Sequence, residues 1–129
     1  MAFGTNTTIT NGGKAASVFG LLGQVDDPKF LALGTGATGA ARTAAVGDTG
    51  LSNEIAIVGT NAGAPTTVNV SDDTYTVAQT YTAVADVAID EAGLFDAASG
   101  GNMFLSATFP VVNLLNGDTI QVTAEVTYS

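Results

Sequence analysis

The residues of this chain that could do chemistry are mostly glycines and carboxylates. The sequence GTGATG at residues 34–39 fits the G-x-G-x-x-G pattern that cradles a dinucleotide, and Glu54 lies near the distance expected of a ribose-binding acid. A dinucleotide fold also needs an amphipathic helix that opens at the third glycine. Residues 40–50 are small and polar and show no apolar stripe. We therefore interpret residues 34–39 as a flexible loop and expect no bound cofactor.

Carboxylates gather at residues 26–27, at residues 72–73 and within residues 86–91. Oxygen ligands from loops are what calcium prefers, and two carboxylates suffice for the acid and base of a glycosidase. None of these groups has the spacing of an EF-hand loop, and the chain has no tryptophan to grip a sugar. Acidic pairs in turns are usually solvated turn formers. We expect no metal site and no catalytic residue.

The composition excludes most other kinds of catalytic group. The chain has no cysteine and no histidine, which excludes disulfides, thiolate nucleophiles, imidazole bases and the usual zinc sites. We therefore expect a protein that is not an enzyme.

The charge balance is strongly acidic. The net charge is −9, with only Lys14, Lys29 and Arg42 positive, which argues against nucleic-acid binding because phosphate contacts need clustered basic residues. A basic partner surface or a high-salt medium would suit such a charge. No apolar run reaches the length of a membrane span, and the N-terminal residues lack the basic-then-apolar pattern of a signal peptide. We expect a soluble protein with no membrane partner.

The elements that must position these residues are mostly strands. Two-residue alternation is clear over residues 74–82 and 119–128, where apolar residues occupy one face and threonines line much of the other. Shorter apolar runs also predict strands, and Asp48 is a candidate N-cap for a helical turn over residues 48–54. The shorter predicted strands cover residues 29–33, 55–58, 66–70 and 84–89.

The strongest helical pattern lies near the N-terminus. Ala15, Val18, Phe19 and Leu22 recur at spacings of three and four, which predicts one short helix over residues 14–23. Short strands, frequent turns and one small helix together predict an all-β, single-domain antiparallel β-sandwich, either jelly-roll-like or immunoglobulin-like. At 129 residues the chain is long enough for one core.

Residues 91–109 are the predicted centre of this core. Two apolar runs flank the flexible sequence SGGN at residues 99–102, as in a hairpin whose arms are both buried. Glu91 and Asp96 are interpreted as turn and edge polarity around the hairpin. The residues expected to hold the sandwich together are Leu94, Phe95, Met103, Leu105 and Phe109.

The first 13 residues have no helical period and are rich in threonine, asparagine and glycine. We expect residues 1–13 to form an extended arm and residues 14–129 to form the sandwich domain. An arm of this kind needs a partner to become ordered. The residues expected to bind that partner are Phe3, Thr7, Thr8, Ile9 and Thr10.

Several short motifs follow one another in a fixed order along the chain: FLALGTG at 30–36, DTGLSNEI at 48–55, EAGLFDA at 91–97, GNMFL at 101–105 and GDTIQVT at 117–123. In this order they resemble a family of small virion structural proteins of tailed bacteriophages and archaeal tailed viruses. The stretch EAGLFD at residues 91–96 is also similar to the N-terminal domain of phage tail-collar fibre proteins.

The resemblance implies a virion component without catalysis. In a capsid, the domain would decorate or cement the shell in many copies, as a trimer or dimer bound to the major capsid protein. In the tail, it would be a collar or baseplate adaptor that anchors fibres. The absence of a fibre shaft from the sequence favours the capsid, in a virion assembled in the host cytoplasm. A third hypothesis is a module that binds host-surface glycans.

Overall fold

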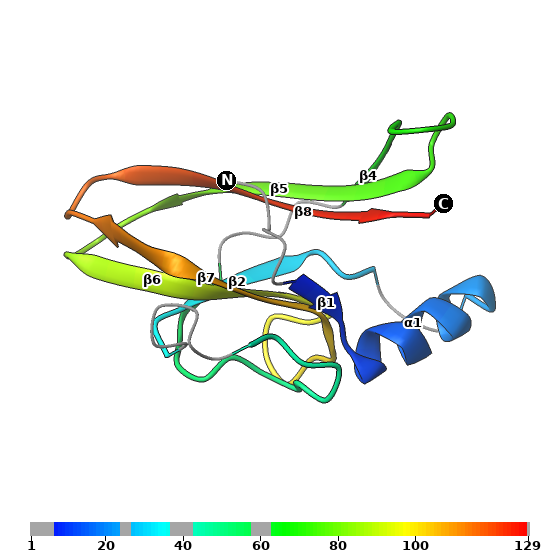
Figure 1. Cartoon of the computed structure of the whole chain (residues 1–129), viewed down its shortest axis with the longest axis horizontal. Helices are drawn as coiled ribbons and strands as arrows, with labels where there is room; N and C mark the ends of the chain where they lie inside the picture. Colours follow the sequence, from blue (N-terminus) through cyan, green and yellow to red (C-terminus); the bar gives the residue numbers. More distant parts are fainter. Residues whose placement is uncertain (1–6, 24–26, 37–42, 58–62, 129) are drawn as a thin grey trace.

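The computed structural model describes residues 7–23, 27–36, 43–57 and 63–128, and it confirms the predicted all-β sandwich with one short helix (Figure 1). A five-stranded antiparallel sheet has the order β1-β7-β6-β2-β3, and a three-stranded antiparallel sheet has the order β4-β5-β8. Within the described part of the chain, no helix is both long and apolar enough to cross a bilayer. In chain order the elements are β1 (Thr7–Ile9), α1 (Asn11–Leu21), β2 (Phe30–Gly34), β3 (Glu54–Ile57), β4 (Ala64–Thr66), β5 (Thr74–Thr82), β6 (Val87–Phe95), β7 (Met103–Leu114) and β8 (Thr119–Thr127).

The chain passes twice between the two sheets at the same end of the sandwich (Figure 1). One connection joins β5 to β6 and the other joins β7 to β8. Hydrogen bonds tie them together, because the Ala83 N–H donates to the Asp118 carbonyl at 2.8 Å and the Gly117 N–H donates to the Ala83 carbonyl at 2.7 Å. This arrangement stacks β8 over β7 and β5 over β6.

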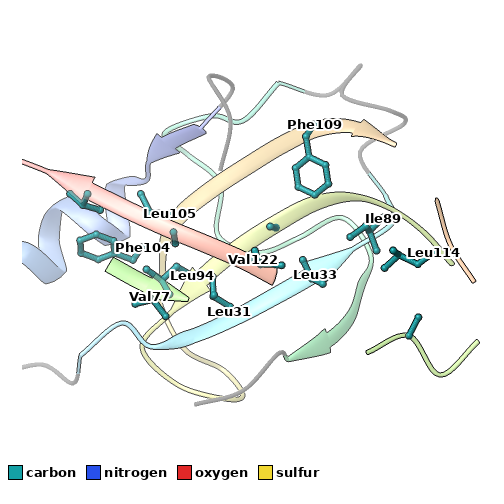
Figure 2. Packing of buried hydrophobic residues seen from close by; sticks show 14 residues of the cluster. Leu31, Leu33, Val77, Ile89, Leu94, Phe104, Leu105, Phe109, Leu114 and Val122 are labelled. Atoms are coloured by element: carbon teal, nitrogen blue, oxygen red, sulfur yellow. The ribbon is translucent and has the colours of Figure 1, made fainter. Parts of the chain in front are cut away.

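The predicted hairpin over residues 91–109 is the β6–β7 pair at the middle of the larger sheet. Side chains from both sheets meet on its inner face, as Figure 2 shows for the largest of them. The hairpin residues expected in the core are all buried: Leu94, Phe95, Met103, Leu105 and Phe109.

Both faces of the central hairpin are covered, and not only the face toward β5 and β8. Residues 103–109 are buried without interruption, because loops over residues 43–53 and 96–102 lie on the outer face of the larger sheet (Figure 1). A second, smaller apolar cluster forms under these loops from Ala32, Phe95 and Met103, with Leu51 packed against it. The continuous apolar run of β7 follows from burial on both sides.

The N-terminal segment differs from the extended arm expected over residues 1–13. Residues Thr7–Ile9 form β1, which pairs antiparallel with β7. The helix begins at Asn11 rather than at residue 14, because Thr10 acts as its N-cap and its hydroxyl accepts the Gly13 N–H at 3.0 Å. The domain therefore includes residues 7–13, and Phe3 lies outside the described residues.

Two other local predictions were wrong. The strand expected over residues 66–70 is displaced to Ala64–Thr66, because the Asp73 carboxylate binds the N–H groups of residues 68–70 and holds them in a turn. Residues 48–53 contain no helical turn. Asp48 instead accepts the Ala45 N–H at 3.0 Å and the Ser106 hydroxyl at 2.6 Å, which fastens its loop to β7.

Candidate functional site

The most organised polar site of the described chain is the Glu91 carboxylate in β6. The side chain is fully buried, on the same face of the sheet as Gly93 and Phe95. Its Oε1 accepts the N–H of Asn53 at 2.8 Å and the N–H of Gly36 at 3.2 Å, and its Oε2 accepts the N–H of Ser52 at 3.0 Å. One carboxylate thus fastens both ends of the β2–β3 connection to the central hairpin. The interpretation of Glu91 as edge polarity was wrong.

The glycines of the 34–39 motif make room for this carboxylate. Gly34 lies directly across the ladder from Glu91, and a Cβ at Gly34 would overlap Oε1 of that side chain. A Cβ at Gly36 would overlap Ser52 at the other end of the same connection. Residues 34 and 36 are therefore glycines because other protein atoms approach them closely. The rest of the motif, residues 37–39, lies outside the described residues.

The turn of the central hairpin is closed by its own acidic residue. Asp96 accepts the Asn102 N–H at 2.7 Å and the Asn102 side-chain amide at 3.0 Å. A shallow pocket of about 310 Å³ lies between this turn and the loop before β3, lined by residues 49–51, Glu54, Phe95 and residues 97–101. The resemblance motifs at 48–55, 91–97 and 101–105 thus meet on one side of the sheet.

The other acidic groups of the sequence are also used in turns. Asp73 accepts N–H groups from residues 68–70 and the Thr74 hydroxyl. The backbone donors of Val70 and Val68 hold the pKa of Asp73 well below its ordinary value. Asp86 accepts the N–H of Asn116 at 2.9 Å. In the described part of the chain, no three acidic residues converge as a metal ligand set would.

The residues expected to bind a partner through the arm are placed within the domain. Thr7, Thr8 and Ile9 pair in order with Ala107, Ser106 and Leu105 of β7. Thr10 is fully buried, and its hydroxyl donates to the Met103 carbonyl. The Thr10 side chain is therefore unavailable to a partner, whereas partner binding by residues 7–9 stays a prediction.

The helix α1 presents its apolar stripe to solvent, which the sequence reasoning missed. Gly13 packs so closely on β7 that a Cβ there would overlap the Phe104 carbonyl, so small residues form the inward face of the helix. The stripe that predicted the helix points the other way. The exposed fractions are 61% for Val18, 48% for Phe19 and 65% for Leu22. The close spacing of Gly12 and Gly13 was the available signal, because glycine permits such an approach.

A pocket of about 370 Å³ lies beside α1, between the helix and the ends of β5 and β8. Ala16, Ser17, Gly20 and Phe104 line one part of it, and the remaining wall comes from Gly23, Asp27, Pro28, Tyr75, Val126 and Tyr128. The Tyr75 hydroxyl donates to the Pro28 carbonyl at 2.8 Å, and burial together with the Asp27 charge raises the Tyr75 pKa. The exposed stripe and this pocket lie on different faces of α1, because none of Val18, Phe19 and Leu22 lines the pocket.

Comparison of the chain with family models, curated proteins and solved structures found no match in any of the three.

Proposed function

We propose that this chain is a non-enzymatic structural protein of a tailed-virus particle, which binds the capsid as a decoration or cement protein. The observation that carries the proposal is the exposed stripe of α1 at Ala15, Val18, Phe19 and Leu22. A helix of this amphipathic pattern normally buries its apolar face. On a virion, the major capsid protein would supply the covering surface.

The charge distribution of the chain agrees with docking through α1. The chain has a net charge of −9, yet α1 contains no acidic residue and carries Lys14. The helix is therefore a weakly charged patch on an acidic protein. A partner with an apolar groove rimmed by basic residues would bury the stripe and attract the surrounding carboxylates.

The residues that carry the resemblance share one structural role in this chain. Gly34, Gly36, Ser52, Asn53 and Glu91 come from three of the motifs and meet around the Glu91 carboxylate. Their task is to position loops on a sandwich. Similar motifs in this order would build a similar domain, which is the expectation for a structural protein family.

The alternative is a tail, collar or baseplate adaptor, and one observation favours it. Val84 is 82% exposed and Leu115 is 62% exposed, and both lie in the connections at the end of the sandwich opposite α1 (Figure 1). A protein with apolar contacts at both ends could link two partners. A decoration protein needs only the α1 end.

Variant incorporation into particles tests the proposal. In the virus that encodes the chain, the double variant Val18→Ser/Leu22→Ser should reduce the copies per purified particle at least tenfold. The matched control is Val68→Ser/Val70→Ser, which removes two side chains of similar exposure, 59% and 65%, from the β4–β5 connection. Equal incorporation of both double variants would refute docking through α1. Antibody labelling of the intact particles then distinguishes the capsid from the tail.

A further inference from the structure

The pocket beside α1 combines apolar and aromatic side chains with a single carboxylate. Its volume of about 370 Å³ falls within the usual range of ligand pockets, about 300–1,000 Å³. Phe104 and Val126 are each 7% exposed and form a buried part of the wall, whereas Tyr128 is 63% exposed. None of the described residues that line the pocket is basic. The pocket therefore offers apolar contact and negative charge but no positive group.

The carboxylate in this pocket, Asp27, is not used to hold the fold. Asp73, Asp86 and Asp96 each accept a backbone N–H and so stabilise a turn or a connection. Asp27 is exposed and, within the described part of the chain, accepts no hydrogen bond and joins no ion pair. Burial and then the Asp27 charge raise the pKa of Tyr75, which places this carboxylate near the Tyr75 ring. Asp27 is therefore a negative charge beside an aromatic side chain, with its hydrogen-bonding capacity left for a partner.

The C-terminal end of α1 adds partial negative charge to the same wall. Gly20 lies in the last turn of the helix and Gly23 follows its end, and both residues line the pocket. The carbonyl end of a helix carries about half a negative elementary charge, so a positive group is favourable next to it. The last turn of α1 contains no basic residue. A cation in the pocket would therefore be stabilised both by the helix end and by the Asp27 carboxylate.

The aromatic rings of the pocket favour the same kind of ligand. Tyr75, Phe104 and Tyr128 all line it, and aromatic faces attract cations, arginine most often. The Tyr75 hydroxyl already donates to the Pro28 carbonyl at 2.8 Å, so it has no donor left for a neutral polar ligand such as a sugar. A guanidinium both stacks on aromatic rings and forms a two-pronged hydrogen bond to a carboxylate. Arginine is therefore the side chain that this wall fits best.

The net charge of the chain indicates where such an arginine comes from. The chain has a net charge of −9 and a single arginine, so two copies would repel each other. A basic partner would instead be attracted to the acidic surface. The occupant that the charges favour is thus a side chain of a different, basic protein.

We propose that the pocket beside α1 receives an arginine side chain of a basic partner protein, with its guanidinium on the Asp27 carboxylate and its stem along Phe104 and Val126. The proposal deepens the proposed function by naming one contact of the partner. It rests on that function only for the partner being a particle protein. Because the pocket and the apolar stripe lie on different faces of α1, the arginine contact is separate from the apolar contact.

A titration of the purified full chain, followed by nuclear magnetic resonance, tests the chemistry of the pocket. The probes are N-acetyl-arginine amide and N-acetyl-citrulline amide, which are similar in shape but differ in charge. The arginine probe should shift the amide signals of Ser17, Gly20 and Tyr128, with a dissociation constant of about 1–10 mM. The citrulline probe should bind at least about fivefold more weakly, because it lacks the positive charge. Equal binding of both probes would overturn the proposal.

Two variants with the same change in net charge separate the pocket from the general acidity of the chain. Asp27→Asn should weaken binding of the arginine probe at least about fivefold. Glu125→Gln is the matched control, because Glu125 is exposed on β8 and does not line the pocket. The control should leave the dissociation constant unchanged. An equal loss in both variants would show that the probe responds to net charge only, which would overturn the proposal.

Incorporation into particles tests the partner. Asp27→Asn should lower the copies per purified particle at least about fivefold relative to Glu125→Gln, because only the first variant removes the pocket carboxylate. Equal incorporation of the two variants would overturn the assignment of the pocket to a partner's arginine. A neutral sugar is the competing ligand class. Stronger binding of N-acetylglucosamine than of the arginine probe at the same residues would assign the pocket to glycans and overturn the proposal.

The α1 variants distinguish failure of this proposal from failure of the proposed function. A preference for the arginine probe combined with normal incorporation of Val18→Ser/Leu22→Ser would refute docking through the stripe and leave the pocket chemistry intact. Poor incorporation of that double variant, combined with no preference for arginine over citrulline, would refute the pocket proposal and leave the docking of α1 intact.

Discussion

The carboxylate of Glu91 accepts the backbone N–H of Asn53 at 2.8 Å, although 38 positions separate the two residues. The bond joins the centre of the larger sheet to the loop that precedes its edge strand β3. Two further N–H groups, from Gly36 and Ser52, share the same carboxylate. Both ends of the β2–β3 connection, which carry two of the resemblance motifs, are thus held by one buried side chain.

Removal of this carboxylate should destabilise the domain strongly. Glu91→Ala leaves three N–H donors without their acceptor and creates a cavity, so we expect a loss of about 3–5 kcal/mol in the free energy of unfolding. Urea unfolding followed by circular dichroism measures it. Glu91→Gln keeps the shape but turns an NH₂ group toward an N–H donor, and should cost roughly 1–3 kcal/mol. Equal stability of Glu91→Ala and the unmodified chain would contradict the role of Glu91.

The glycine at residue 34 is predicted to serve packing and not a nucleotide. Gly34→Ala should displace the Glu91 side chain and lower the free energy of unfolding by roughly 2–4 kcal/mol. Gly50→Ala is the control, because nothing lies within 4 Å of a Cβ at that position. The unmodified chain should show no NAD binding by calorimetry. A measurable dissociation constant would revive the dinucleotide interpretation of residues 34–39.

The attachment of α1 should depend on the Thr10 hydroxyl. Thr10→Ala removes both the N-cap bond to Gly13 and the bond to the Met103 carbonyl, and should cost about 1–2 kcal/mol. Thr10→Ser keeps both bonds and should recover at least half of that loss. Hydrogen exchange of the α1 amides provides a local readout, with faster exchange expected in Thr10→Ala. Equal stability and equal exchange in the alanine and serine variants would contradict a stabilising role of the Thr10 hydroxyl.

Asp73 should make stability depend on pH in the acid range. Its folded pKa lies below the ordinary value of 3.8, so its stabilising bonds are complete above about pH 5 and are lost as the pH falls toward the folded pKa. Asp73→Asn should therefore be less stable at neutral pH and lose less stability between about pH 5 and pH 2. Asp72→Asn is the control, because that neighbouring side chain is exposed. An identical acid profile for Asp73→Asn and the unmodified chain would contradict the prediction.

Regular patterns allowed much of the sandwich to be predicted from the sequence. Two-residue alternation placed β5 over Thr74–Thr82 and β8 over Thr119–Thr127, because each strand has one buried and one exposed face. The hairpin at residues 91–109 was visible because burial on both sides requires continuous apolar runs. Strand order was not predictable, because two strands that pair can lie far apart in the chain.

The errors occurred where a single long-range contact outweighs local preference. Residues 11–13 have the composition of a turn, yet Thr10 and the closeness of β7 start a helix there. The apolar stripe of α1 predicted a helix, but its spacing did not show that the stripe would face solvent. Glu91 looked like edge polarity because a sequence does not show which backbone donors surround a carboxylate. Such contacts depend on loops that converge only in the folded chain.

The copy number of this chain in purified virus particles tests the central claim most directly. Quantitative mass spectrometry, normalised to the major capsid protein, measures it in particles of the virus that encodes the chain. A decoration protein predicts hundreds of copies per particle. At most a few tens of copies would favour the tail adaptor, and particles that contain none of this chain would contradict a structural role in the virion.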